Sequence, residues 1–306
     1  MVHLSLNGAQ TPFDGMGVNT WLSSDLCGAS AKTLLKAGWP VRALVLDAAG
    51  PASLTLQNAG AELFQGSFED RDVIRAAMKE AYGVFSVLPG NLTAEDEERH
   101  GFAIADIAAE SGIEHFVYSS GASAGDELTG VPRFDAKPRI EAHVRNLSIT
   151  ATIIRPMIFI EMLVRPGFGL DQGRLVSLIR RDQAIHLTAV EDIGKFAAAV
   201  FADKVRFGGK ILKIASDRVT GRELEAAFTE AAGRQITYER FPDDVLSSNA
   251  DLAHMAKSLE DGPLSERVDL DAMREINPEL LSLRTWLAGS GRAALEEALG
   301  TTGPVR

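Results

Sequence analysis

The chain has 306 residues, enough for one large α/β domain or for such a domain with a smaller lobe attached. Its formal net charge of -11 excludes recognition of nucleic acid through a broad basic face, and its single cysteine, Cys27, excludes an internal disulfide and favours a reducing, cytoplasmic location. We expect neither a signal peptide nor a membrane span, because residues 1–5 carry no basic segment and the apolar stretch 149–164 is broken by charged residues.

The N-terminal region predicts an interrupted dinucleotide-binding turn. Leu4 and Leu6 could end a first strand, Gly8 would begin the glycine turn after it, and Gly28 would begin the next helix. A dinucleotide fingerprint holds its glycines within about six residues, because the turn is tight and the helix amides must meet the pyrophosphate. Gly8 and Gly28 are 20 positions apart, so residues 12–27 are expected to be an insertion or a replacement of the native loop.

Three interpretations of residues 12–27 stay open. The first is an irregular surface loop, which the commonness of such loops favours. The second is a turn partly rebuilt by Gly15 and Gly17. The third is a shifted reading frame or an altered splice over residues 1–27, which the other frames of the coding DNA would test.

From residue 40 onward, the sequence alternates between two hydrophobic periods. Buried strands are predicted at 41–46, 61–65, 84–88, 115–119 and 150–155, and helices at 70–81, 93–110 and 134–147. This alternation is typical of βαβ units. It predicts a Rossmann-type, doubly wound parallel sheet over residues 1–156, with helices on both faces.

Beyond Pro156 the pattern indicates a smaller α+β substrate lobe, residues 157–306, partly interleaved with the first domain. Capping boxes at 188–191 and 220–223 are expected to open helices that end near 202 and 232. Short strands are predicted at 210–214 and 235–239, and the remainder is expected to be helical to about residue 299.

Several segments resemble the NmrA-like family of atypical short-chain dehydrogenases. They are residues 28–47, 66–70, 116–120, 131–137, 154–162, 190–194 and 270–287, so that the resemblance covers about residues 28–290. The resemblance implies an extended Rossmann domain that binds NAD(P)(H), with a small substrate lobe. The group includes redox-sensing regulators that bind the dinucleotide without turning it over, and reductases of quinones, dyes and related small molecules.

The cofactor implied is NAD or NADP, and one departure from the family favours NAD. The family commonly carries an arginine after the second strand, where it meets the 2′-phosphate of NADP, but this chain has Asp47 there. A carboxylate accepts a hydrogen bond from a 2′-hydroxyl and repels a phosphate, although Arg42 or Lys36 could compensate. A dinucleotide fingerprint is followed by an acidic residue about 20 positions later, and Asp47 lies 19 residues after Gly28. The alternative is that Asp47 is a solvated turn residue. The family's acid near the adenine is replaced by Ser67, which weakens that contact.

Classical short-chain dehydrogenases use a Tyr-x-x-x-Lys pair, in which the lysine lowers the tyrosine pKa for proton transfer. Counted back from Lys137, the tyrosine position holds Arg133, so carbonyl reduction by a tyrosine is not expected. Lys137, Ser119 and Ser120 are the catalytic candidates. Lys137 is expected at the nicotinamide ribose, and a solvated lysine is the alternative. Ser119 and Ser120 end a buried strand where substrate or nicotinamide would lie, and turn capping is the alternative for them.

The remaining candidates are apolar residues that follow predicted strands. Core packing or strand termination would explain each of them as well. Those expected at the cofactor are Leu88, Pro89, Pro156 and Met157, and those expected at a substrate pocket are Phe159 and Met162. The sequence shows no metal-ligand spacing, Gly-x-Ser-x-Gly elbow or Walker loop, so no metal is expected.

Two functions of different classes therefore compete. The first is an oxidoreductase that passes hydride from NAD(P)H to a small acceptor such as a quinone, and the second is a non-catalytic redox sensor that regulates a protein partner. The missing tyrosine favours the sensor, whereas residues 156–190, which could close a pocket, favour the enzyme. A third interpretation is a fold that has lost cofactor binding with its glycine turn. Self-association as a homodimer is also considered; nucleic acid and membranes are not expected partners.

Overall fold

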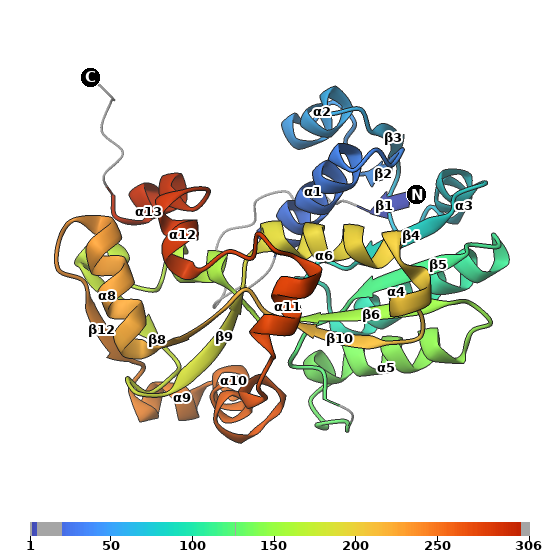
Figure 1. Cartoon of the computed structure of the whole chain (residues 1–306). Coiled ribbons are helices and arrows are strands. Elements are labelled where there is room, and N and C mark those ends of the chain that lie inside the picture. Colours follow the sequence, from blue (N-terminus) through green and yellow to red (C-terminus); the bar gives the residue numbers. More distant parts are fainter. Residues whose placement is uncertain (1, 5–19, 126, 301–306) are drawn as a thin grey trace. The chain divides into compact units, whose positions relative to one another are not determined.

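The computed structural model describes residues 2–4, 20–125 and 127–300, with side chains from residue 26 onward. The chain divides into two compact units (Figure 1). The first comprises Met1–Pro156 and Val190–Lys213, and the second comprises Met157–Ala189 and Ile214–Arg306. Val190–Lys213, which the sequence places in the smaller lobe, thus belongs to the first unit.

The first unit is built on a seven-stranded sheet with the order β10-β6-β5-β4-β1-β2-β3. Its strands are β1 (Val2–Leu4), β2 (Arg42–Val45), β3 (Glu62–Gln65), β4 (Gly83–Val87), β5 (His115–Ser119), β6 (Ala151–Pro156) and β10 (Ile211–Ile214). The neighbouring pairs from β6 to β3 all run parallel. Every residue of β4 and β5 is buried, as expected of central strands with both faces covered. The predicted Rossmann-type parallel sheet is confirmed.

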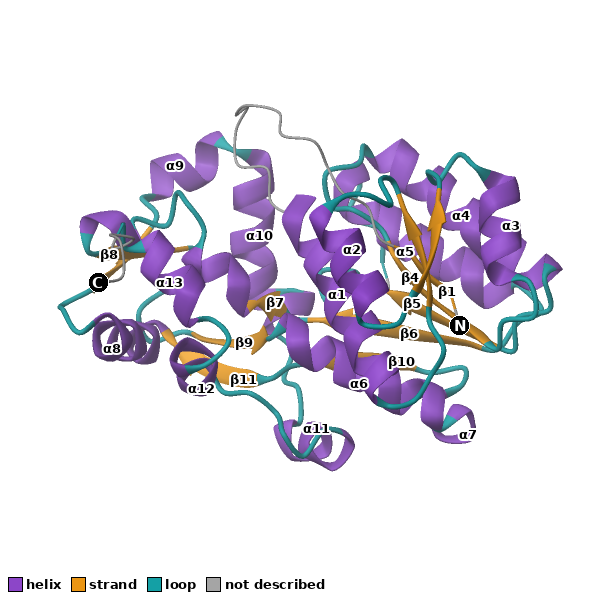
Figure 2. Cartoon of the chain, turned by 90° about the horizontal axis from the view of Figure 1, so that it is seen from above, coloured by secondary structure: helices purple, strands orange, loops and turns teal. Residues whose placement is uncertain are grey.

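Helices cover both faces of this sheet (Figure 2). They are α1 (Thr20–Lys36), α2 (Pro51–Asn58), α3 (Arg71–Met78), α4 (Ala94–Glu110), α5 (Pro132–Asn146), α6 (Val190–Ala202) and α7 (Lys204–Phe207). Helix α1 packs on α6 and α2, whereas α4 packs between α3 and α5. A core of aliphatic and aromatic side chains fills the α3–α5 side, including Ile74, Ile104 and Phe116. The sheet thereby holds its strand ends, and the side chains that follow them, on a rigid base.

Helix α1 corrects one prediction from the N-terminal region. It begins at Thr20, eight residues before Gly28, so the expectation that a helix begins near Gly28 is wrong. Residues 20–27 contain no proline or glycine, and Leu26 and Cys27 are buried with Ala31 at helical spacing, so that the helix includes the last eight residues of the predicted insertion. The amide of Gly28 therefore lies beyond the first turn, where helical amides bond within the helix. Gly8, Gly15 and Gly17 lie outside the described residues.

A pair of glycine substitutions tests this helix and its packing. A Cβ on Gly28 would meet no atom within 4 Å, so Gly28→Ala should raise the free energy of unfolding by about 0.5–1 kcal/mol, as for a glycine inside a helix. A Cβ on Gly194 of α6 would lie 2.9 Å from the carbonyl oxygen of Ala29 in α1. Gly194→Ala should therefore lower the same quantity by about 1–3 kcal/mol. Urea unfolding measures both, and a loss of stability in Gly28→Ala would contradict the helix assignment.

The second unit combines two small sheets with helices, in agreement with the α+β lobe expected. One sheet has the order β11-β9-β7, formed by β7 (Ile158–Phe159), β9 (Ala184–Thr188) and β11 (Asp217–Thr220); the other pairs β8 (Arg174–Ser177) with β12 (Thr237–Arg240) in parallel. The helices are α8 (Gly221–Ala232), α9 (Asp243–Ser248), α10 (Ala250–Asp261), α11 (Leu270–Ile276), α12 (Leu283–Ala288) and α13 (Arg292–Ala298), with 3-10 turns η1 (Ile160–Val164), η2 (Leu170–Gln172) and η3 (Pro263–Ser265).

The two capping boxes predicted from Ser/Thr-x-x-Glu patterns have different outcomes. At the start of α8, Thr220 accepts from the amide of Glu223 while the Glu223 carboxylate accepts from the amide of Thr220, so this box is confirmed. The box expected at 188–191 is wrong, because Thr188 ends β9 and its hydroxyl donates to the carbonyl of Ile214 at 3.0 Å. No helix in the described part of the chain is long and apolar enough to cross a membrane.

Candidate functional site

The carboxyl ends of the parallel strands bring most of the predicted site residues to one edge of the first unit. The strand order reverses between β1 and β4, the point where ligands bind in open α/β sheets. The predicted residues at this edge are Asp47 after β2, Ser67 after β3, Leu88 and Pro89 after β4, Ser119 and Ser120 at the end of β5, and Pro156 at the end of β6. The topology therefore positions the candidates of five strands around one place.

Lys137 reaches this edge from the second turn of α5. Its ammonium forms an ion pair with the carboxylate of Glu97, which lies in the first half of α4. A Cβ on Gly121, in the loop after β5, would lie 3.6 Å from Cδ and 3.9 Å from Cε of Lys137. The side chain of Lys137 thus passes over a residue that has no side chain of its own. The ammonium thus lies near the end of β5, and its contact with a ribose stays a prediction.

The two serines at the end of β5 are both buried. The amide of Ser120 donates to the carbonyl of Ile154 at 2.8 Å, which fixes the backbone against β6. Its hydroxyl oxygen is buried and has no hydrogen-bond partner among the described residues. A buried hydroxyl without a partner costs free energy that a bound polar ligand would recover. Lys137 lies nearby, and the glycine turn predicted for a pyrophosphate falls outside the described residues.

Tyr118 occupies the position before these serines, but it is not a proton donor for the site. It is fully buried, and burial, followed by the nearby charges of Glu97 and Glu141, raises the pKa of its phenol well above the ordinary value. Its hydroxyl has no hydrogen-bond partner in the described part of the chain. A raised pKa makes this phenol a weaker acid, the opposite of the lowered pKa with which a classical tyrosine transfers its proton.

Asp47 is exposed after β2. Both interpretations of this residue, a ligand of the 2′-hydroxyl and a solvated turn residue, require that exposure. One carboxylate oxygen accepts from the amide of Ala49 at 2.9 Å, which closes a short turn. The other oxygen has no hydrogen bond among the residues that the structure describes, and it is available to a hydroxyl ligand. The preference of Asp47 for a 2′-hydroxyl stays a prediction.

Ser67 hydrogen-bonds within its own loop, between β3 and α3. Its amide and hydroxyl donate to Oδ2 of Asp70 at 2.6 and 3.0 Å, and its hydroxyl oxygen accepts from the amide of Glu69 at 3.1 Å. The two bonds from Ser67 lower the pKa of the Asp70 carboxyl. The hydroxyl of Ser67 is therefore already used as donor and acceptor within the loop, and its weak contact with an adenine stays a prediction.

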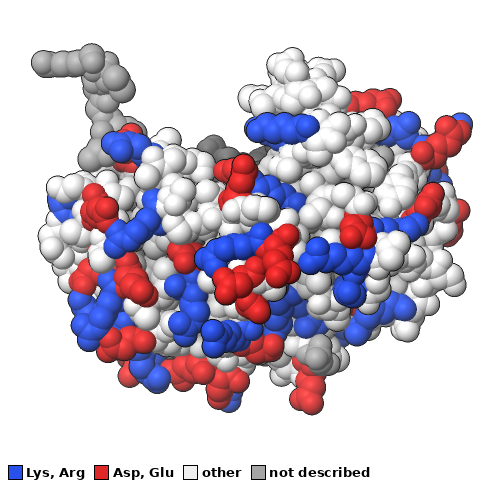
Figure 3. Space-filling model, viewed as in Figure 1, with Lys and Arg blue, Asp and Glu red and all other residues white. Residues whose placement is uncertain are grey.

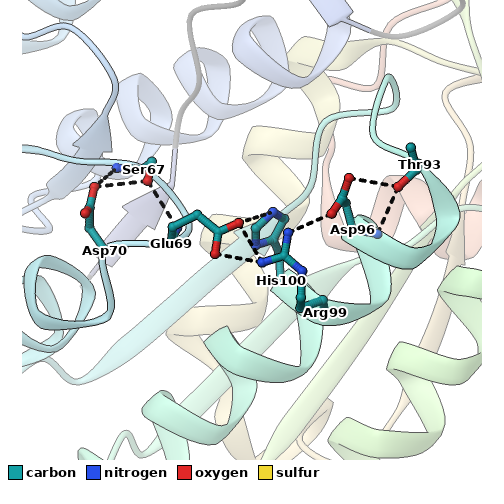
Figure 4. A network of polar contacts seen from close by, with 7 residues as sticks. All are labelled: Ser67, Glu69, Asp70, Thr93, Asp96, Arg99 and His100. Carbon is teal, nitrogen blue, oxygen red and sulfur yellow. Dashed lines mark hydrogen bonds and ion pairs between the residues drawn. The ribbon is translucent and has the colours of Figure 1, made fainter.

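Arg99 fastens this loop to the start of α4 (Figure 4). Its guanidinium donates to both carboxylate oxygens of Glu69, at 2.6 and 2.7 Å, and to Oδ1 of Asp96 at 2.6 Å. These hydrogen bonds lower the pKa of both carboxyls. The rings of Phe68 and His100 lie 5.4 Å apart within the same connection. Exposed ion pairs add little stability singly, so the main effect of the network is to hold the loop after β3 against α4.

The apolar candidates divide between the two units. Leu88 is buried at the end of β4 beside the core of the first unit. Met157 is buried in the second unit, and its amide donates to the carbonyl of Ile214 at 3.0 Å. Phe159 in β7 and Met162 in η1 are half-buried in that unit. Their assignment to a substrate pocket stays a prediction.

Two buried acidic residues were missed by the sequence argument. Glu97 belongs to four consecutive acidic residues, 95–98, and nothing in the sequence distinguishes it from its neighbours. Glu141 forms a buried ion pair with Arg155 of β6, with distances of 3.0 and 2.6 Å. The available signal was weak: Arg155 is a charged residue inside an otherwise apolar strand, and such a residue needs a buried partner.

The surface shows no broad field of one sign in the view drawn. On both units, the face in Figure 3 carries Lys and Arg side chains interspersed with Asp and Glu side chains. Among the described residues, no group of three or more His, Cys, Asp or Glu side chains is arranged to hold a metal ion.

The strand order and the parallel pairing define a Rossmann-type fold, whose candidate site lies at the switch point of the sheet. The model of the NmrA-like family matches residues 25–286. The chain therefore belongs to the NmrA-like family.

Individual relatives agree with this assignment. An NmrA-like family domain-containing oxidoreductase of Aspergillus hancockii is 27% identical over 241 residues, which cover 69% of this chain and 71% of the relative. The crystal structure of NmrA, a negative transcriptional regulator, in complex with NADP superposes with a TM-score of 0.74 at 20% identity, over 97% of this chain and 96% of the other. The crystal structure of triphenylmethane reductase of Citrobacter sp., complexed with NADP(H), superposes with a TM-score of 0.71 at 17% identity. The match covers 90% of this chain and 96% of the other. The structural neighbours confirm the fold.

Proposed function

We propose that this protein binds a nicotinamide dinucleotide along the carboxyl ends of β2 to β6 and passes hydride to a small acceptor such as a quinone. The observation that carries the proposal is the arrangement of Lys137 and the unpartnered hydroxyl of Ser120 at the end of β5. The reduced nicotinamide supplies the hydride when it is bound. The ammonium of Lys137 would bind the ribose hydroxyls, while Ser119 and Ser120 would orient the nicotinamide or the acceptor.

An acceptor that forms a stabilised anion suits this site better than a simple carbonyl. Arg133 stands where a classical tyrosine would, and a guanidinium stays protonated at neutral pH and is a poor acid. A quinone needs no strong acid beside it, because its reduced anion is stabilised and can take its proton from water. The oxidoreductase name of the Aspergillus relative also supports this reaction class.

We further propose that NAD(H) is preferred to NADP(H), and that the protein is cytoplasmic. The free carboxylate oxygen of Asp47 would accept from the adenosine 2′-hydroxyl and repel a 2′-phosphate. The single cysteine, Cys27, is typical of a reducing compartment.

Titration calorimetry with NADH and NADPH tests the proposal directly. Lys137→Met should raise the dissociation constant for NADH about 10- to 100-fold, because it removes hydrogen bonds from a charged donor. Lys204→Met is the matched control. Lys204 also forms an ion pair, at 2.9 Å, but its partner Glu114 precedes the first residue of β5, at the opposite end of the strand from Ser119. This variant should bind NADH like the wild type. Absence of binding of either nucleotide to the wild type would overturn the proposal.

A second function, a redox sensor that regulates a protein partner, is favoured by the same Arg133 and by the regulatory role named for NmrA. Both functions require the dinucleotide, so binding alone does not separate them. NADH oxidation across a panel of quinones does: turnover assigns the oxidoreductase, whereas tight binding without turnover assigns the sensor.

A further inference from the structure

The carboxylate that pairs with Lys137 is an unusual group at the edge of this sheet. The side chain of Glu97 is only 8% exposed, although three other acidic residues surround it in the sequence of α4. Burying a carboxylate is costly unless a charged partner compensates. The partner is Lys137, forty positions later in α5, so the pair joins two helices at the point where both begin.

Lys137 gains a fixed position from this pair. A lysine side chain has four rotatable bonds and loses conformational entropy when it is held in place. Its ammonium has three N–H donors, and one of them is directed to Glu97. Within residues 2–4, 20–125 and 127–300, the other two donors have no hydrogen-bond partner, a number that suits the two hydroxyls of a ribose.

We propose that Glu97 is a positioning residue that orients the ammonium of Lys137 toward the ribose of the bound dinucleotide. The ligand part of this inference rests on the proposed function, whereas the positioning of Lys137 does not. The stem of Lys137 runs beside the backbone of Gly121, since a Cβ there would lie at ordinary van der Waals distance from its Cδ and Cε. Glu97 acts only through Lys137 and itself touches no ligand.

A neighbouring ion pair offers a matched control. Glu98 follows Glu97 in α4 and pairs with Arg139 of α5 at 2.7 Å, so it joins the same two helices. The side chain of Arg139 is 43% exposed, compared with 25% for Lys137, and lies farther along α5. Glu98→Gln removes the same charge and the same kind of link between α4 and α5. A purely structural role of Glu97 would therefore give both variants similar behaviour.

The first measurement needs no cofactor. The protein is labelled briefly with acetic anhydride, and acetylation of each lysine is followed by peptide mass spectrometry. Glu97→Gln should raise the labelling rate of Lys137 at least about threefold, because the amine is released from its ion pair. Glu98→Gln should leave that rate unchanged, and Glu97→Asp, which keeps the charge, should fall between wild type and Glu97→Gln. Equal labelling of Lys137 in wild type and Glu97→Gln overturns the inference.

The second measurement is a double-mutant cycle on NADH affinity. Glu97→Gln should raise the dissociation constant about tenfold in the wild-type background and leave it unchanged in the Lys137→Met background, because the two residues act as a unit. Glu98→Gln should have no effect in either background. An equal loss of affinity in both backgrounds would overturn the inference by showing that Glu97 acts independently of Lys137. If the wild type binds no nucleotide, the proposed function fails, while the labelling experiment still decides whether Glu97 holds Lys137.

Discussion

Replacing Glu141 by glutamine is expected to lower the free energy of unfolding by about 3–5 kcal/mol, the cost of breaking a buried ion pair from one side. Glu141 in α5 is completely buried, and Arg155 in β6 is 5% exposed. Nε and an Nη of the guanidinium donate to the two carboxylate oxygens at 3.0 and 2.6 Å. The variant removes the carboxylate charge that faces the buried guanidinium of Arg155.

Urea unfolding at neutral pH measures the loss, and a double replacement provides the control. Arg155→Met combined with Glu141→Leu removes both charges and should recover most of the stability lost in Glu141→Gln. The exposed pair Arg292–Glu296 should change stability by no more than about 1 kcal/mol when Glu296 is replaced by glutamine. A loss below about 1 kcal/mol in Glu141→Gln would show that the buried pair does not stabilise the fold as inferred.

Acid is expected to destabilise the fold through His115, the first residue of β5. Its imidazole is buried, and burial, with a smaller contribution from Lys204, lowers its pKa to about 4. Its Nε2 lies 2.8 Å from Oγ1 of Thr152, whose hydroxyl donates to the carbonyl of Phe207 at 2.9 Å. Since Thr152 uses its hydrogen in that bond, its oxygen accepts from Nε2 of His115, which therefore carries the single hydrogen of the neutral imidazole. Burial favours this neutral form of the ring.

The direction of the pH effect follows from the lowered pKa. Above the ordinary histidine pKa of about 6.5, both the folded and unfolded states hold a neutral ring, so His115 adds no pH dependence. As the pH falls from about 6.5 to about 4, the unfolded chain takes up a proton that the folded protein does not. Stability is lost over this window, by about 3 kcal/mol in total, and the loss levels off below pH 4.

Unfolding by urea at intervals between pH 7 and pH 4 checks this contribution. His115→Phe keeps an aromatic ring against Phe201, whose centroid lies 5.5 Å from the imidazole, and removes the titrating group. As the pH falls, the free energy of unfolding should therefore decrease more in the wild type than in His115→Phe. Parallel profiles for the two proteins would show that His115 is not protonated differently on unfolding.

The sheet was the most predictable part of the molecule. Its strands are short apolar runs bounded by turns, and β2 to β6 lie within two residues of their predicted limits because period and burial coincide there. The start of α1 was not predicted, since Gly28 was interpreted as a helix start although the preceding residues continue the helix. The false capping box at 188–191 shows the limit of local motifs: the hydroxyl of Thr188 bonds a carbonyl 26 positions away.

The sequence predicts where the residues of the candidate site lie better than it predicts which residues pair with them. Ser120 and Lys137 follow from the rule that ligands bind at the carboxyl ends of parallel strands, together with the family resemblance. Glu97 did not follow, because only the packing of α4 against α5 decides which of four consecutive acidic residues is buried. An ion pair between residues forty positions apart depends on how the two helices pack, and no local sequence pattern predicts that packing.

The discontinuous course of the chain restricts how such proteins can be recombined. The first unit is left after Pro156, re-entered at Val190 and left again after Lys213. A fragment ending at Pro156 would lack α6, on which α1 packs, and would expose β6 as an unpaired edge prone to aggregation. Chimeras that graft the second unit of one relative onto another must therefore be spliced at three junctions, and libraries built with a single crossover should yield mostly insoluble products.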